Sequence, residues 1–281
     1  MFCEDKMNID SVLDILQLIG TFGHIISTAE SLMLHNSLLI LQTENHFQNI
    51  FYWGKILGTE DDYYIAYGYS KDILLKRTYY YSKDCINWGL LPQPNNIGLE
   101  LTPLCKTNFQ GNAALVTEIK MEEEQIMDAR SNKPPLIKRL KEEDRLSATV
   151  HLITKEVAVV PRGALFKRSD GVIVENRSFE GLSPLEATDL ASYQHFRPAT
   201  QKLKNNLFAR KDYNYAIDFL DTIDMDVPTN CWTIQPTKDE TGVIIRSMYW
   251  PGMIFYHFSK TPKHGFLYTG NGKKCIDLPF M

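Results

Sequence analysis

The sequence predicts an α+β fold, in which a mostly antiparallel β-sheet packs against helices and two further helices lie at the N-terminus. Up to about residue 45 the apolar residues recur with the period of a helix, and from residue 51 they recur with a period of two. Turn signals such as Asp170-Gly171 and Pro251-Gly252 separate short strand-like runs, as in antiparallel hairpins. The 281 residues contain no repeat of fixed length, and we expect them to form a single domain, 1–281.

Residues 1–45 are expected to form a helical N-terminal segment. Asp10 has the character of an N-cap, and the apolar residues after it keep helical spacing until Gly20. A second helix is predicted after Ser27, because Ser27 and Glu30 have the spacing of a capping box. Its apolar residues Leu34, Leu38 and Leu41 share one side.

Three strands are predicted next, at residues 51–57, 63–69 and 78–82, arranged as an antiparallel meander. In the middle strand, large residues such as Tyr63 and Ile65 alternate with Tyr64, Ala66 and Gly68 on the opposite face. Residues 92–135 are rich in proline, asparagine and acidic residues, and we expect a surface loop or insertion there. A helix is predicted from residue 138 to about residue 153, with Leu146 and Val150 on its inner face.

The second half of the chain alternates short strands with short helices. Residues 157–160 read as a buried strand that ends at Pro161, and 165–175 read as a hairpin with a two-residue turn at Asp170-Gly171. Ser183 to Glu186 predict a capped helix, and the spacing of Tyr213, Ala216, Ile217 and Leu220 predicts another near residue 212. Strands follow at 232–235, 243–250, 253–258 and 266–269, with a type II turn at Pro251-Gly252.

Composition and charge limit the classes of function. The net charge of −4 and the isoelectric point of 6.0 argue against a general nucleic-acid-binding protein. No basic-then-apolar leader opens the sequence and no apolar run is long enough to span a membrane, so we expect no membrane partner. The five cysteines are scattered without a C-x-x-C pair, which predicts reduced thiols in the cytoplasm and no zinc site.

Candidate catalytic residues do not form a recognisable motif. The seven histidines lack metal-ligand spacing, and no nucleophile elbow is present, so we assign no catalytic, metal or cofactor-binding residue. His257 stands in an aromatic strand, where a hydrogen-bonded structural role is favoured over that of a general base. A dispersed-site hydrolase that combines His257 with Cys231 or Asp277 is kept as an alternative.

Aromatic residues make up 11% of the chain, and rings in excess of the needs of a core often mark interfaces. Arg162 follows a buried strand in a Pro-Arg-Gly sequence, where it serves either a turn or a bidentate contact. We expect Arg162, Tyr67 and Trp250 to contact partner proteins. A further alternative is a free-standing peptide-binding module that uses an exposed strand edge within residues 78–82.

Several strings of residues, in this order, resemble the radial spoke head protein 9 family, and some of them also resemble the related spoke-head proteins 4 and 6. The resemblance covers most of residues 51–281. The strings are FYWGKILG at 51–58, DYYIA at 62–66, DRLS at 144–147, VAVVPRGALF at 157–166, NRSFEGL at 176–182, YQHFR at 193–197, RSMYWPG at 246–252 and DLPF at 277–280.

The resemblance implies a non-enzymatic structural subunit of the radial spoke head, in the axoneme of cilia and flagella, part of the cytoskeleton. Its implied partners are head proteins of the 4/6 type, the MORN-repeat head protein and spoke stalk proteins, with the central-pair projections met indirectly. Its implied role is to support spoke-head assembly and the mechanical regulation of ciliary bending. The family lends no catalytic residue and no cofactor.

Overall fold

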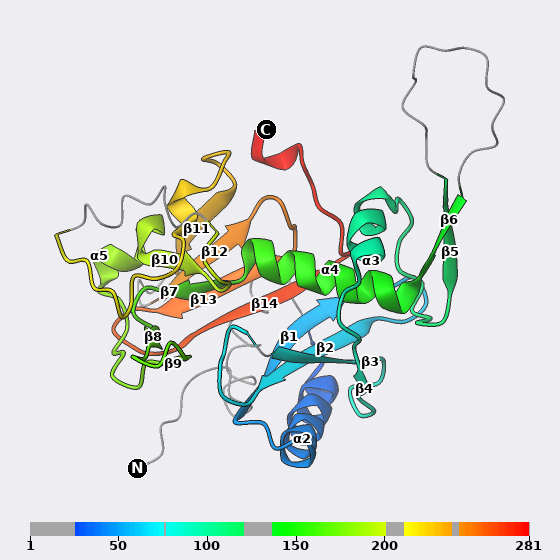
Figure 1. Ribbon diagram of the computed structural model, residues 1–281, viewed down its shortest axis with the longest axis horizontal. Coiled ribbons are helices and arrows are strands. Elements are labelled where there is room, and N and C mark those ends of the chain that lie inside the picture. Colours follow the sequence, from blue (N-terminus) through cyan, green and yellow to red (C-terminus); the bar gives the residue numbers. More distant parts are fainter. Residues whose placement is uncertain (1–25, 76, 121–136, 201–210, 238–241, 281) are drawn as a thin grey trace.

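A computed structural model describes residues 26–75, 77–120, 137–200, 211–237 and 242–280, and its centre is one eight-stranded mixed sheet (Figure 1). Six of its seven neighbouring strand pairs are antiparallel, while β1 and β14 lie side by side in parallel. The α+β class is thereby confirmed. In spatial order the strands are β11 (Trp232–Pro236), β12 (Gly242–Ser247), β13 (Met253–Phe258), β14 (His264–Gly270), β1 (Asn49–Ile56), β2 (Tyr63–Tyr69), β3 (Arg77–Ser82) and β4 (Gly89–Leu90).

Two helices cover the two faces of this sheet. Helix α2 (Thr28–Glu44) packs Leu34 and Leu38 against one face, in a core that includes Tyr64 of β2. Helix α4 (Glu142–Val157) packs against the other face, in a second core that includes Ile65 of β2 (Figure 1). Successive residues of a strand point to opposite faces, so the predicted alternation in this strand now has its reason in two covering layers.

The predicted capping box of α2 is confirmed: the backbone N–H of Glu30 donates to Ser27 Oγ at 3.2 Å, and that of Ser27 donates to the Glu30 carboxylate at 2.7 Å. The helix predicted between residues 10 and 20 lies outside the described residues. Apolar residues occupy all sides of α2, because Leu32 and Ile40 are exposed while Leu34 and Leu38 are buried.

Residues 92–135 were expected to form a surface loop or insertion, and the described part of this range contains helical turns, buried side chains and a strand. Residues 96–104 form helix α3 (Asn96–Leu101) and the 3-10 turn η2 (Thr102–Leu104), and Leu101 and Phe109 are buried. Strand β5 (Val116–Lys120) then pairs with β6 (Ile137–Lys141), and this ribbon projects from the body in Figure 1. Asparagine and proline serve here as caps and turn residues, as with Asn95, whose side chain caps α3.

The predicted helix from residue 138 begins four residues later, at Glu142, because residues 137–141 are held as a strand by pairing with β5. It also extends to Val157, so the strand predicted at 157–160 is reduced to β7 (Val159–Pro161), which pairs with β10 (Tyr193–His195). The predicted inner face is confirmed, since Leu146, Val150 and their neighbours on that side are buried.

The hairpin at 165–175 is confirmed as β8 (Leu165–Lys167) and β9 (Ile173–Glu175). Its turn differs from the two-residue turn expected, because only Gly171 has a positive φ, of 86°. The N–H of Gly171 donates to the carbonyl of Arg168, which gives a longer connection with the left-handed residue last. The predicted capped helix is α5 (Pro184–Ala187), followed by the 3-10 turn η3 (Leu190–Ser192).

The helix predicted near residue 212 does not form, although its apolar spacing is regular. The N–H of Asn214 donates to the Asp218 carboxylate at 2.9 Å, and that of Ala216 donates to the Asn214 side chain at 3.0 Å. Aspartate and asparagine side chains therefore bind backbone groups that a helix needs. The short turns η5 (Ile223–Met225) and η6 (Leu278–Phe280) complete the described elements.

The four C-terminal strands β11 to β14 agree with the predicted ones within a few residues. Between β12 and β13 the N–H of Met253 donates to the carbonyl of Trp250, and Gly252 has a φ of 100°. This geometry confirms the turn predicted at Pro251-Gly252. β14 then returns to the middle of the sheet beside β1, so the first and the last strand of the described chain are neighbours in one sheet.

Candidate functional site

His257, the candidate general base, lies fully buried on β13 with both ring nitrogens engaged. The backbone N–H of Leu182 donates to Nε2 at 3.2 Å, and Nδ1 lies 3.3 Å from the carbonyl oxygen of Lys263. Since Nε2 accepts, Nδ1 carries the proton and donates it to that carbonyl. Burial lowers the pKa of His257 to about 4. The ring therefore serves as a neutral link between strands and has no free nitrogen for proton transfer.

The candidate nucleophile Cys231 is equally unsuited to chemistry. It is 2% exposed, and burial raises the pKa of its thiol to about 11. Only the thiolate is a nucleophile, so this cysteine is unreactive near neutral pH. Within the described ranges no hydrogen bond or ion pair joins His257 to Cys231 or Asp277, and no cluster of three potential metal ligands occurs.

A buried carboxylate, which the sequence did not single out, fixes the start of α4. Glu142 accepts hydrogen bonds from three successive backbone N–H groups, those of Gln110, Gly111 and Asn112, at 2.9–3.0 Å. The hydroxyl of Tyr63 also donates to it at 2.8 Å. With these donors the carboxylate is fully used in tying the loop at 110–112 to α4 and β2, so it anchors structure.

Arg162 makes the bidentate contact that was considered, but with its own chain. Its Nε and Nη2 donate to the two carboxylate oxygens of Asp218 at 2.6 and 2.8 Å, and Nη1 donates to Asp212 at 2.5 Å. The Asp218 side chain is completely buried, and the hydrogen bonds raise the pKa of Arg162. This network explains the irregular 212–220 segment, and it leaves the guanidinium committed within the molecule.

Trp250 is also held internally, at 3% exposure, where its indole Nε1 donates to Glu156 of α4 at 2.8 Å. Tyr67 is different, because it is only half-buried and lies at the wall of a pocket. Its ring stacks on Phe51, with 5.2 Å between ring centroids, and packs against Tyr79. Burial raises the pKa of its hydroxyl. The expected contacts of Arg162, Tyr67 and Trp250 with partner proteins stay predictions.

A second polar cluster, missed in the sequence because its members are remote, joins β10 to β11. His195 Nε2 lies 2.9 Å from Asp226, and the indole of Trp232 donates to the same carboxylate at 2.8 Å. His195 belongs to the string YQHFR at 193–197, but its distance of 31 residues from Asp226 matches no known motif. The cluster crosses from one small sheet to the edge of the large one, which makes it a tie between layers.

The strand edge that suggested a peptide-binding module is covered. β3 lies between β2 and β4, with Tyr80 and Tyr81 paired to Leu90 and Gly89. The N–H of Leu91 also donates to the carbonyl of Tyr79. Residues 78–82 therefore offer little free edge to a peptide, which counts against this alternative.

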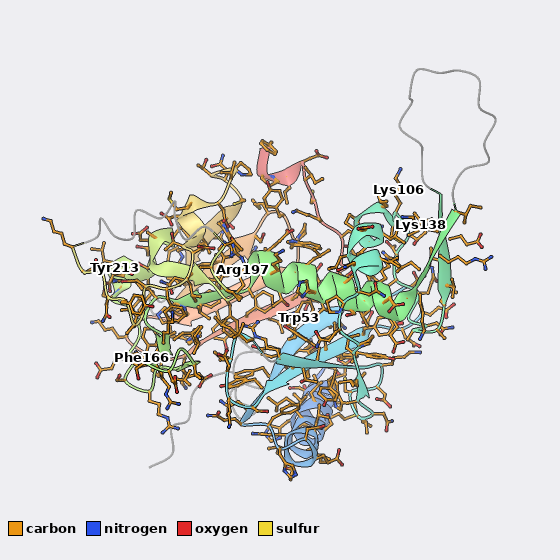
Figure 2. The ribbon with its side chains drawn as sticks, viewed as in Figure 1. Trp53, Lys106, Lys138, Phe166, Arg197 and Tyr213 are labelled. Carbon is orange, nitrogen blue, oxygen red and sulfur yellow. The ribbon has the colours of Figure 1, made fainter. Side chains whose placement is uncertain are left out.

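A pocket of about 60 Å³ lies next to β1 and β14. Its lining is mainly apolar and aromatic, and it comes from β1, β14, β7 and β8 together with single residues such as Tyr67, Ile73 and Phe196. Trp53 lies at its wall, beneath α4 in Figure 2, with its indole N–H donating to Thr154 at 2.9 Å. No charged group converges on its apolar part apart from Arg77 and Glu175, so it suits an apolar group rather than a reacting one.

The comparisons with known proteins agree with a structural class. A profile of the radial spokehead-like protein family matches residues 3–163. The chain is similar to proteins named radial spoke head protein 9 homolog: 36% identical to those of Bos taurus and Homo sapiens and 37% to that of Danio rerio. Each of these matches covers 98% of this chain and all of the relative.

A mixed sheet covered by helices on both faces defines an α+β protein. The chain belongs to the radial spokehead-like protein family. It is a component of the radial spoke head in the axoneme of cilia or flagella. In the described part of the chain, no helix is long and apolar enough to cross a membrane.

Proposed function

We propose that this chain is a non-enzymatic subunit that stiffens the radial spoke head and holds its sister subunits in place. The observation that carries the proposal is the similarity to radial spoke head protein 9 homologs over 98% of the chain. It is supported by the chemistry of the interior, where the candidate base, nucleophile and arginine are each bound or protonated.

The mechanism is the transmission of load through packing. A sheet clamped between α2 and α4 resists bending, because close-packed interiors have low compressibility. The aromatic residues add to this stiffness: Trp53 contacts Tyr268 across the parallel strands, at 5.4 Å between ring centroids, and Tyr63 contacts Phe109 at 6.3 Å. Ties such as the Glu142 and Arg162 networks connect the outer loops to the same block.

The partners we propose are head proteins of the 4/6 type, the MORN-repeat head protein and spoke stalk proteins, with the central-pair projections met through the assembled head. The surface supports binding of proteins, since several large apolar side chains are exposed, among them Leu185 at 83% and Val227 at 86%. Exposed apolar groups of this kind are typical of assembly surfaces when they gather into patches. No role in nucleic-acid or cofactor binding is proposed.

The proposal is tested by tagging the full-length chain in motile ciliated cells and purifying it from isolated axonemes. Proteins of the spoke head and stalk should copurify with it, and loss of the chain should leave spokes without complete heads in electron micrographs. A tagged chain with Gly54→Ala should fold less stably, because a Cβ at Gly54 would lie 2.0 Å from the carbonyl oxygen of Tyr268, and it should therefore recover fewer partners. Purification from axonemes without any spoke component would contradict the proposal.

Turnover is a separate test of the enzymatic alternative. The purified chain and its Cys231→Ser variant should be equally inactive toward ester and peptide substrates, since Cys231 is buried and protonated. A rate that disappears with Cys231→Ser would establish an enzyme, whatever the outcome of the purification.

A further inference from the structure

The ribbon of β5 and β6 has an unpaired edge on each side, because among the described strands these two pair only with each other. Figure 1 shows the ribbon standing out from the body at the end of the molecule where α4 begins. It is attached through one face, on which Ile119 and Leu140 are buried in a small apolar cluster with Leu101 and Cys105. A two-stranded ribbon is only marginally stable by itself in water, whereas three strands with an apolar face are stable.

The hydrogen-bond ladder between the two strands decides which backbone groups point away from the ribbon. The N–H of Glu142 donates to the carbonyl of Leu115 at 2.7 Å, which makes these two residues a hydrogen-bonded pair in the register of the ribbon. Hydrogen-bonded and non-hydrogen-bonded pairs alternate along antiparallel strands. The residues of the pairs in between therefore direct their N–H and C=O groups outward: Val116 and Glu118 on β5, and Ile137 and Arg139 on β6.

These outward groups are accessible. Val116 is 52% and Ile137 is 49% exposed, and the side chains of Glu118 and Arg139 are more than half exposed. Within the described ranges no hydrogen bond reaches the backbone N–H or C=O groups of these four residues. A strand edge with unpaired donors and acceptors is a template for a further strand, and an extended chain has the spacing that satisfies it.

Charge distinguishes the β6 edge from the β5 edge. The five residues of β6 include Lys138, Arg139 and Lys141 and no acidic residue, whereas β5 contains Glu118. Arg139 Nε and Nη2 lie 3.1 and 3.0 Å from Oε1 of Glu118, and Lys141 is bound to Glu143. Solvent-exposed ion pairs of this kind are weak. Lys138 forms no ion pair with any other residue that the structure describes, so β6 carries uncompensated positive charge.

Two further lysines lie on the side of the ribbon that carries Lys138. Lys138 is paired with Ile119, and the face that they share is the one buried with Cys105. Lys106 follows Cys105 in the chain, and Figure 2 labels Lys106 and Lys138 at this end of the molecule. The Nζ of Lys273 donates to the carbonyl of Lys106 at 2.6 Å, which brings a third ammonium group to the same place. Such a positive surface attracts carboxylates and steers their approach.

We propose that the edge of β6 binds an extended, acidic segment of another spoke-head protein, which adds as a third strand beside residues 137–141. Its backbone satisfies the outward groups of Ile137 and Arg139, and its carboxylates lie opposite Lys138 and Arg139. Opposite charges across neighbouring strands are favourable and like charges are not, so the equally basic β6 of a second copy is a poor occupant. This inference rests on the proposed function and specifies how one partner is held.

Amide hydrogen exchange of the full-length chain, alone and in isolated spoke heads, tests whether a strand is added. The amides of Ile137 and Arg139 should exchange about tenfold or more slowly in the spoke head, because each becomes hydrogen-bonded. The amides of Val116 and Glu118, on the opposite edge of the same ribbon, are the internal control and should keep their rates. Unchanged exchange at Ile137 and Arg139 would overturn the proposal, and so would equal slowing at both edges.

Photo-crosslinking identifies the occupant. Benzoylphenylalanine in place of Ile137, within assembled spoke heads, should crosslink to a segment of another head protein that is rich in aspartate and glutamate. The same substitution at Phe166, which is exposed at the opposite end of the molecule in Figure 2, is the matched control and should not reach that segment. Crosslinks from position 137 to residues 121–136 of this chain, which include Glu122 to Glu124, or to a second copy would overturn the proposal.

A charge reversal tests the acidic character of the segment. Lys138→Glu, combined with the crosslinker at position 137, should reduce the yield of that crosslink about fivefold, because an attraction across the strands becomes a repulsion. Lys71→Glu changes an exposed lysine of the loop after β2 and should leave the yield unchanged. Equal yields in the two variants would overturn the choice of an acidic partner. Circular dichroism of both purified variants verifies that they fold.

These outcomes are distinct from failure of the proposed function. A chain that copurifies with spoke heads but shows no slowed exchange at Ile137 and Arg139 refutes only the added strand. A chain that is missing from spoke heads refutes the proposed function itself.

Discussion

Gly54→Ala should weaken the pairing of β1 with β14. The loss in free energy of unfolding should be larger than the backbone strain at residue 54 alone would cause. An added Cβ would lie 2.0 Å from the carbonyl oxygen and 2.7 Å from the amide nitrogen of Tyr268, which are backbone atoms that no rotamer change can move. The strands must therefore separate at the one place where they are hydrogen-bonded. Gly171→Ala is the matched control, because Gly171 also has a positive φ but a Cβ there meets nothing within 4 Å.

The expected magnitudes follow from this difference. In Gly171→Ala, about 1–2 kcal/mol of left-handed strain is offset by about 0.4–1 kcal/mol from the stiffer unfolded chain, a net loss near 1 kcal/mol. Gly54→Ala adds to a similar strain the loss of two or so backbone hydrogen bonds at about 1 kcal/mol each, for a total of roughly 3 kcal/mol. At about 2–4 °C per kcal/mol, the melting temperature should fall by roughly 10 °C.

Thermal unfolding followed by circular dichroism, with urea unfolding as a second measure, compares the two variants with the parent chain. Gly54→Ala should unfold at clearly lower temperature and urea concentration than Gly171→Ala. If the free energies of unfolding of the two variants agree within about 1 kcal/mol, the usual scale of a single hydrogen bond, the close contact at Gly54 does not hold the strands together.

Three further predictions concern groups buried in the interior. Arg162→Ala should lower the free energy of unfolding by about 3–5 kcal/mol, because it leaves the buried Asp218 carboxylate unpaired; urea unfolding measures this. The pKa of His257 is about 4 in the folded chain and about 6.5 in the unfolded chain, so between these pH values only the unfolded chain binds the proton. Lowering the pH through this range should therefore reduce the free energy of unfolding by up to about 3 kcal/mol. His257→Gln should flatten that part of the pH–stability curve. Iodoacetamide at pH 8 should modify Cys275, which is partly exposed, and leave Cys231 unmodified in peptide mass spectra.

Each of these has its own control. Arg139→Ala removes an exposed ion pair with Glu118 and should lower the free energy of unfolding by less than about 1 kcal/mol. If Arg139→Ala and Arg162→Ala lower it equally, the hydrogen bonds of Arg162 to Asp218 do not stabilise the fold. His264→Gln changes a less buried histidine of the same sheet, and a flattened curve there but not in His257→Gln would reverse the assignment. Rapid labelling of Cys231 in the folded chain would show that its environment is open.

Local chemistry made much of the fold predictable. Ser27 and Ser183 each had a glutamate three residues later, and both capping boxes form because their hydrogen bonds lie within one turn. Gly252 had to follow Pro251 in a tight turn, and it adopts the positive φ that this turn requires. Such features depend only on neighbours in sequence, which is why the strands and helices next to them were correctly predicted.

The candidate site was less predictable, since its contacts join distant residues. The apolar residues from Tyr213 to Leu220 have ideal helical spacing. The segment nevertheless forms turns, because Asp218 is bound by Arg162, which lies 56 residues earlier in the sequence. Nothing near Arg162 in the sequence indicated that partner. The role of Glu142 was hidden for the same reason, because its donors lie about 30 residues earlier in the chain.

The amino-acid sequence alone determined the α+β class, the capped helices, most strand positions and the resemblance to spoke-head proteins, because these follow from periodicity and short-range hydrogen bonds. Only the tertiary structure decided that β14 returns beside β1, that Arg162 and Trp250 turn inward, and that a pocket opens at Trp53. Parallel pairing of strands some 200 residues apart is settled by whether two backbones approach closely enough. At Gly54 and Tyr268 that approach depends on a missing Cβ and on the bulge beside it.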